Sequence, residues 1–151
     1  MEHAVDEQAK GRIVVGVDGS EGSLRALQWA AEEARVRAVG MLVVTCWQFP
    51  ALVAAGPFQP PIAAEMLEED ARETLETTVE RALGPEDERD DVLAEVCEGP
   101  APLRLVELSK HAAMVVVGSR GRGGFAGLVL GSVSQHLAGH ARCPVVIVHG
   151  G

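Results

Sequence analysis

The chain has 151 residues, which suggests one domain and would hold two only if both were unusually small. Apolar residues make up 47% of it and charged residues 23%, values that exclude a chain disordered throughout. The formal net charge is -9, which argues against nucleic acid as the main partner because nucleic-acid binding needs a basic surface. The negative charge is concentrated in residues 62–98, which hold 14 of the 22 acidic residues, so an anion pocket elsewhere is compatible with the total.

The first half of the chain alternates between apolar runs and helical spacing. Arg12–Val17 (RIVVGV) predicts a strand that enters a turn at Asp18–Ser20. Apolar side chains every three or four positions from Leu24 to Ala38 predict a helix with Gly40 as its stop. Met41–Trp47 is a continuous apolar run, which is typical of a strand buried on both faces of a parallel sheet.

A long loop and an acidic helix follow. Phe49–Pro61 contains four prolines and predicts a loop long enough to be functional. The helical spacing from Leu67 to Ala82 predicts a second helix with an acidic outer face, ended by Pro85. An acidic loop is expected at Glu86–Asp91, and a third strand at Val92–Cys97.

The last third of the chain completes the alternation. We expect a helix at Ala101–Ala112, a strand at Met114–Val117, a glycine-rich loop at Ser119–Gly127, a helix from about Ser132 to His140 and a strand at Pro144–His149. This order predicts an open parallel sheet with helices on both faces. In such a sheet ligands bind beyond the carboxyl ends of the strands, where the strand order switches.

The glycine-rich loop after the fourth strand is the strongest functional motif. It contains no lysine and is therefore not a P-loop. It also matches the dinucleotide fingerprint poorly, because Ala126 takes the place of the third glycine and no acidic residue follows Glu107. The remaining pattern is Gly118, two residues, Gly121, nine residues, and then Gly131-Ser132 at a helix start.

This pattern suits a phosphate group. Glycines let the backbone approach closely, and a helix start offers free N–H groups, the positive end of the dipole and the Ser132 hydroxyl. Arg120 and Arg122 add positive charge. The alternative is a flexible loop in which Ser132 is a plain helix cap.

The same pattern resembles the ATP-binding signature of the universal stress protein family. The resemblance extends from IVVGVDGS in the first strand to CPVVIVH at the end, and GSRGRGGFAGLVLGSVSQHL is similar to bacterial members of the ATP-binding branch. It implies one domain over residues 1–151, with an ordered core at about 11–149. It also implies a Rossmann-like (adenine nucleotide alpha hydrolase-like) sheet of order 3-2-1-4-5. The implied ligand is ATP with Mg²⁺ or Mn²⁺.

The resemblance also implies roles for individual residues. Gly16, Val17 and Asp18 would border the ribose and phosphates, with Asp18 suited to a ribose hydroxyl or to the metal ion. The backbone of Cys46 matches the position that pairs with the adenine edge. The residues implied on the ribose and phosphate side are Val117, Gly118, Arg120, Gly121, Gly131, Ser132, Val133 and Ser134. Some family members carry His at the position of Arg120.

Several of these residues also have plainer interpretations. Asp18 can cap the first helix or shape its turn. Cys46 can be a small buried apolar residue, and Trp47 can either line a base pocket or pack in the core. His136 and His140 have zinc-like spacing on one helix, but no third ligand accompanies them.

The three cysteines lack C-x-x-C spacing and predict neither a disulfide framework nor a zinc cluster. The start, MEHAVDEQAK, is no signal peptide, and no apolar run approaches the ~20 residues of a membrane span. We therefore expect a cytoplasmic protein without membrane contact, in which no disulfide joins Cys46 to Cys97.

Three functions are compatible with the motifs. The favoured one is a module that binds ATP and changes its association with partners during stress. The second is an enzyme that hydrolyses ATP slowly or transfers its phosphoryl group, with Asp18 as the sole plausible base. A ligand-free interaction protein is disfavoured by the intact glycine motif, and cyclic AMP remains an alternative ligand. We also expect a homodimer joined at the fifth strand, because that strand is a flat apolar edge.

Overall fold

The structure is a computed structural model, which describes residues 2–50, 57, 61–121 and 130–150. Five strands form one parallel sheet in the order β3-β2-β1-β4-β5, as the family resemblance implied. Their bounds are β1 (Ile13–Gly16), β2 (Met41–Trp47), β3 (Val92–Glu98), β4 (Met114–Gly118) and β5 (Val145–Val148). The predicted fold class, a single α/β domain with an open parallel sheet, is confirmed. The predicted loops Phe49–Pro61 and Ser119–Gly127, with Arg122, lie mostly outside the described residues.

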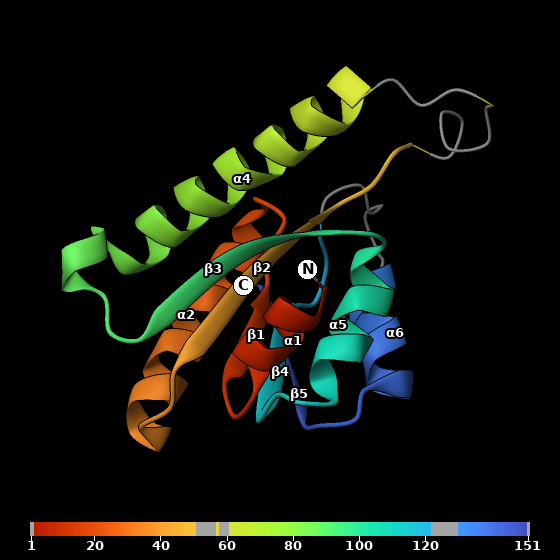
Figure 1. The fold of residues 1–151 in the computed structure, drawn as a ribbon. Coiled ribbons are helices and arrows are strands. Elements are labelled where there is room, and N and C mark those ends of the chain that lie inside the picture. Colours follow the sequence, from red (N-terminus) through yellow and green to blue (C-terminus); the bar gives the residue numbers. More distant parts are fainter. Residues whose placement is uncertain (1, 51–56, 58–60, 122–129, 151) are drawn as a thin grey trace.

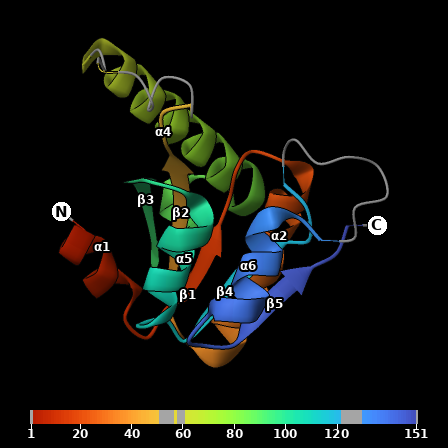
Figure 2. The ribbon, with the colours of Figure 1, turned by 90° about the vertical axis from the view of Figure 1, so that its right-hand side faces the viewer.

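Helices cover both faces of the sheet (Figures 1 and 2). One face packs against α2 (Glu21–Arg37) and α4 (Pro61–Leu83), through a core that includes Leu27, Leu75 and Val79. The other face packs against α1 (Glu2–Ala9), α5 (Ala101–Ser109) and α6 (Ser132–His140), through a core that includes Leu105, Leu108 and Leu137. A short 3-10 helix, η1 (Glu86–Glu88), precedes β3 in the region expected to be an acidic loop.

The central strand β1 explains the position of the site. Ile13 pairs with Met41 of β2 on one side and with Met114 of β4 on the other. Ile13 and Val15 face one core while Val14 faces the other, and all three are fully buried. The strand order reverses between β1 and β4, so their carboxyl ends form the switch point at which open α/β sheets bind ligands.

Helix α1 was not predicted from the sequence. It has only eight residues, which would be marginal as an isolated helix. Tertiary packing holds it: Ala9 is fully buried in the second core and Val5 packs against that core. Sequence periodicity could not reveal it because only these two apolar positions, one helical turn apart, face the sheet.

The predicted stop of the helix that follows β1 was wrong. Helix α2 ends at Arg37, where Ala38 adopts a left-handed conformation (φ 55°) and donates its N–H to the carbonyls of Ala34 and Arg35. Gly40 is therefore not the stop. A Cβ atom on Gly40 would collide with the ion pair between Arg12 and Asp91, whose charged atoms lie 2.9 Å apart.

Two other helices also differ from prediction at one end. Helix α4 begins at Pro61, ahead of the apolar series that starts at Leu67, and proline is well suited to a first helical position. Helix α5 ends at Ser109 rather than at Ala112. None of the helices in the described part of the chain is long and apolar enough to cross a membrane.

Candidate functional site

A cavity of about 340 Å³ opens at the carboxyl ends of β1 and β4. All twelve residues that the sequence singled out line it: Gly16, Val17, Asp18, Cys46, Val117, Gly118, Arg120, Gly121, Gly131, Ser132, Val133 and Ser134. The structure thus brings together three loops and a helix start that are far apart in the sequence. Five further residues line the same cavity: Ser20, Ser23, Val44, Ala101 and Leu105.

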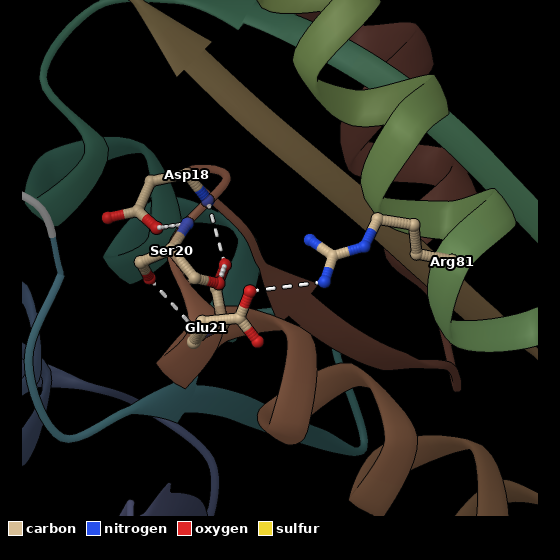
Figure 3. A network of polar contacts seen from close by, with 5 residues as sticks. Asp18, Ser20, Glu21 and Arg81 are labelled. Atoms are coloured by element: carbon tan, nitrogen blue, oxygen red, sulfur yellow. Dashed lines mark hydrogen bonds and ion pairs between the residues drawn. The ribbon is translucent and has the colours of Figure 1, made fainter.

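The turn after β1 holds Asp18 at the edge of the cavity (Figure 3). The Ser20 amide donates a hydrogen bond to Asp18 Oδ1 at 2.9 Å, and the Asp18 amide donates to Ser23 Oγ at 3.3 Å. Gly19 supplies the positive φ (85°) that this turn requires. Asp18 therefore shapes the turn, as the plainer interpretation proposed, but Ser20 is the residue that caps α2.

The carboxylate of Asp18 also faces the loop after β4. A Cβ atom on Gly121 would collide with Asp18 Oδ2, so glycine at this position lets the two segments approach. At the start of α2, Glu21 forms an ion pair with Arg81 of α4 at 3.1 Å (Figure 3). Both side chains are more than half exposed, so this pair orients the helices more than it stabilises them.

Gly118 and Gly131 allow close packing of backbone against backbone. A Cβ on Gly118 would lie 2.9 Å from the carbonyl carbon of Gly22, in the first turn of α2. A Cβ on Gly131 would lie 3.3 Å from the Cα of Arg120. Gly131 has φ -76°, which any residue can adopt, so its need for glycine is steric rather than conformational. This packing role was not foreseen from the sequence, which indicated only close approach to a ligand.

Helix α6 directs its amide groups toward the cavity. Gly131, not Ser132, is the N-cap, and it makes no side-chain cap. Within the described parts of the chain, the amides of Ser132, Val133 and Ser134 have no hydrogen-bond acceptor. Three such N–H groups at the positive end of a helix dipole form a site for an anion.

The two serines in this turn have different roles. The Ser134 hydroxyl is buried and donates to the carbonyls of Ser119, at 3.0 Å, and Gly131, at 3.1 Å. It therefore ties the helix start to the end of β4, while only its amide is directed to the cavity. Ser132 is exposed and lines the cavity.

The inner wall of the cavity is apolar. Val44 and Cys46 lie two positions apart on β2, and Ala101 and Leu105 lie one turn apart on α5. The alternation of the strand could have pointed to Val44 from the sequence, whereas the α5 residues depend on tertiary packing. The pKa of the Cys46 thiol is raised, chiefly because the thiol donates a hydrogen bond to Cys97 and also because it is buried. Cys46 thus presents a neutral side chain to the cavity.

The other candidate residues, Trp47, His136 and His140, are not among the described residues that line the cavity. The ring of Trp47 packs edge to face against the ring of Phe49, with the two ring centroids 5.9 Å apart. The His136 and His140 rings stack at 4.2 Å, and His140 Nδ1 lies 2.9 Å from the His136 carbonyl. In the described ranges no group of three or more His, Cys, Asp or Glu side chains could hold a metal ion.

A parallel sheet of order 3-2-1-4-5 with a cavity at its switch point defines an α/β protein of the doubly wound class, whose members bind ligands at this point of the sheet. Residues 10–149 match the model of the Universal stress protein family. The chain therefore belongs to the universal stress protein family, as the motifs suggested.

The curated relatives are longer proteins. Universal stress protein Rv1996 of Mycobacterium tuberculosis is 39% identical over 144 residues, which cover 89% of this chain and 43% of the relative. A universal stress protein of Mycolicibacterium smegmatis is 38% identical over 148 residues, which cover 91% of this chain and 48% of the relative. The chain spans less than half the length of these relatives.

Solved structures of similar fold contain nucleotides. A universal stress protein in complex with cAMP is 26% identical, with a TM-score of 0.70 over 95% of this chain and 99% of the other. The universal stress protein of Archaeoglobus fulgidus in complex with dAMP is also 26% identical, with a TM-score of 0.63 over 92% of this chain and 98% of the other.

Proposed function

We propose that this chain binds ATP, together with a divalent cation, in the cavity between β1 and β4, and that it acts as a nucleotide-responsive regulatory module. The observation that carries the proposal is the cavity itself, which gathers an apolar wall, a carboxylate and a helix start whose first three amides have no acceptor among the described residues. The complexes of similar proteins with cAMP and dAMP support an adenine nucleotide as the ligand class.

The chemistry of the lining suggests how ATP would lie. The adenine would pack against Val44 and Leu105, with its edge toward the backbone of Cys46. The ribose would lie by Asp18, and the phosphates would receive the amides of α6 and the Ser132 hydroxyl. Arg120 is exposed at the rim and adds positive charge for the phosphates.

The residues present fit a cation that arrives with the nucleotide. Asp18 is the one carboxylate among the described residues of the cavity lining, and one of its oxygens already accepts the Ser20 amide. Mg²⁺ commonly takes one or two protein carboxylates and completes its shell with phosphate oxygens and water. Asp18 would hold Mg²⁺ or Mn²⁺ in this manner, and the ion would neutralise charge on the phosphates.

We expect binding without substantial turnover. Phosphoryl transfer needs a group that orients the attacking nucleophile. Of the described residues around the cavity, only Asp18 could serve as such a base, and it is committed to the turn after β1.

A second ligand, cAMP, is favoured by the cAMP complex of a similar protein. It would use the same adenine and ribose contacts but would lack the β- and γ-phosphates. Titrations with ATP, AMP and cAMP, each with and without Mg²⁺, separate the two possibilities. Tighter binding of ATP that depends on Mg²⁺ supports our proposal, and a preference for cAMP that ignores Mg²⁺ contradicts it.

The bound ligand can also be identified directly. Denaturing release from the purified protein, followed by chromatography, identifies any nucleotide that the protein retains. Incubation of the same sample with ATP measures turnover, and rapid hydrolysis would favour the enzyme alternative.

We also propose a homodimer through β5. This strand lies at the edge of the sheet, and all four of its residues are only half-buried. Pairing with a second copy would cover these apolar side chains and satisfy the outward backbone groups.

A further inference from the structure

Two cysteines face each other across neighbouring strands in the wall of the cavity. Cys46 of β2 and Cys97 of β3 are register partners in the parallel sheet. Neighbouring strands lie about 4.8 Å apart, and register partners direct their side chains to the same face. This separation falls within the Cα range of roughly 4.4–6.8 Å that a disulfide can span.

The two thiols differ in their access to solvent. Cys46 is half-buried and lines the cavity, whereas Cys97 is 5% exposed and belongs to the core under α1 and α5. The cavity thus gives a small molecule a path to Cys46, and Cys97 is the register partner of Cys46 on the next strand. No disulfide joins the two cysteines in the structure.

A buried arginine stands next to Cys97. Arg104 of α5 is 5% exposed, and its positive charge acts on the Cys97 thiol, since it lowers the pKa of that thiol. Its guanidinium lies 4.0 Å from Asp6 and pairs with Glu107, yet its Nε has no hydrogen-bond partner within the described chain. A buried cation with an unpaired N–H favours a negative charge nearby, and the Cys97 thiolate would supply one.

The three thiols of the chain have different pKa values because their surroundings differ. The pKa of Cys97 is lowered to about 7, first because the Cys46 thiol donates a hydrogen bond to its sulfur and also because of the positive charge of Arg104. Burial and the negative charge of Glu95 oppose this shift. Burial raises the pKa of Cys143, which lies before β5 and outside the paired residues of β4 and β5. At neutral pH, therefore, Cys97 is the nucleophile and Cys46 is the adjacent thiol.

We propose that Cys46 and Cys97 form an oxidation site in the cavity wall, at which a hydroperoxide converts the two thiols into a disulfide between β2 and β3. The Cys97 thiolate attacks the terminal peroxide oxygen; an S–O bond forms, the O–O bond breaks, and the alkoxide or hydroxide that leaves takes a proton from solvent to become an alcohol or water. The Cys46 sulfur then attacks the sulfur of the sulfenic acid. An S–S bond forms, the S–O bond breaks, and the departing hydroxide takes the Cys46 proton and leaves as water.

The disulfide would be easily reduced. A relaxed disulfide has its Cβ atoms about 3.8 Å apart, and register partners in a parallel sheet start about 1 Å farther apart. Strained disulfides have more oxidising potentials and serve as transient, regulatory bonds in reducing compartments. Formation of the disulfide would also withdraw the Cys46 sulfur from the cavity wall. The redox state of the two cysteines would therefore change the shape of the cavity.

Thiol counting on the full chain tests the proposal. Protein at neutral pH is treated with hydrogen peroxide, its remaining thiols are alkylated, and intact mass and non-reducing peptide mapping follow. Cys143→Ser is the matched control because it removes the third cysteine and leaves the pair. The wild type should fall from three alkylated thiols to one, with a Cys46–Cys97 linked peptide that dithiothreitol abolishes. Cys143→Ser should fall from two to none.

The single variants distinguish the two steps. Cys46→Ser should stop at a Cys97 sulfenic acid that dimedone traps, and Cys97→Ser should leave Cys46 reduced. If either variant does not fold, the wild type and Cys143→Ser decide the matter alone. Three thiols left in the oxidised wild type, a linkage that involves Cys143, or sulfonic acids without any disulfide would each overturn the proposal.

Discussion

Replacing Gly118 with alanine tests whether the end of β4 packs as closely on α2 as the structure indicates. The new Cβ would lie 2.9 Å from the Gly22 carbonyl carbon, 3.0 Å from its oxygen and 3.3 Å from the Ser23 amide nitrogen. All three are backbone atoms, so the contact cannot be relieved by a side-chain rotation. Overpacking of this kind destabilises by about 1–3 kcal/mol. For a domain of this size the melting temperature should fall by about 2–12 °C.

Gly139→Ala provides the matched control. Gly139 lies in α6, and a Cβ atom there would meet nothing within 4 Å. Alanine should stabilise this helix by about 0.5–1 kcal/mol, because glycine loses more backbone entropy on folding. Thermal melts followed by circular dichroism without nucleotide compare the two variants. A melting temperature of the Gly118→Ala protein that equals or exceeds that of the wild type would refute the close packing of β4 on α2.

Three further predictions concern the helix start, the thiols and the dimer. Ser134→Ala should lower the free energy of unfolding by about 1 kcal/mol because the carbonyls of Ser119 and Gly131 lose a buried hydroxyl donor, as a thermal melt would show. Ser132→Ala should leave the melt unchanged and weaken ATP binding about 10-fold or more in calorimetry. Alkylation of Cys97 should accelerate as the pH rises from about 6 to about 8, because its pKa is lowered to about 7 and the thiolate forms above that value, whereas Cys143 should stay slow. Val148 accepts a hydrogen bond from β4, so its neighbour Ile147 directs its N–H outward, and Ile147→Pro should convert a dimer to a monomer in light scattering without unfolding it.

The sequence predicts the fold well where local signals and tertiary packing agree. The continuous apolar runs at β2 and β4 correspond to strands whose first residues are buried on both faces of the sheet. Alternation of strands and helices indicates a parallel sheet, but the strand order came from the family resemblance. Helix α1 escaped prediction because its stability comes from contacts with α5 and the sheet. Gly40 misled the prediction because glycine signals a helix end, whereas here it accommodates an ion pair between distant residues.

In the candidate site, too, the sequence reveals some residues, while others depend on tertiary packing. The glycine pattern indicates the phosphate side of the site, and the family resemblance implies twelve residues, all of which line one cavity. Leu105 and Ala101 could not be assigned to it from the sequence, because their place depends on how α5 crosses the sheet. The pairing of Cys46 with Cys97 requires the register of β2 and β3, and no sequence spacing reveals that register. The steric role of Gly118 likewise depends on the position of α2.

Equilibrium dialysis of the nucleotide-free wild-type protein against labelled ATP and Mg²⁺ tests the central claim most directly. Our account predicts saturable binding of one ATP per chain, reduced by Ser132→Ala and displaced by unlabelled ATP. Folded wild-type protein that shows no saturable binding at millimolar ATP would contradict it.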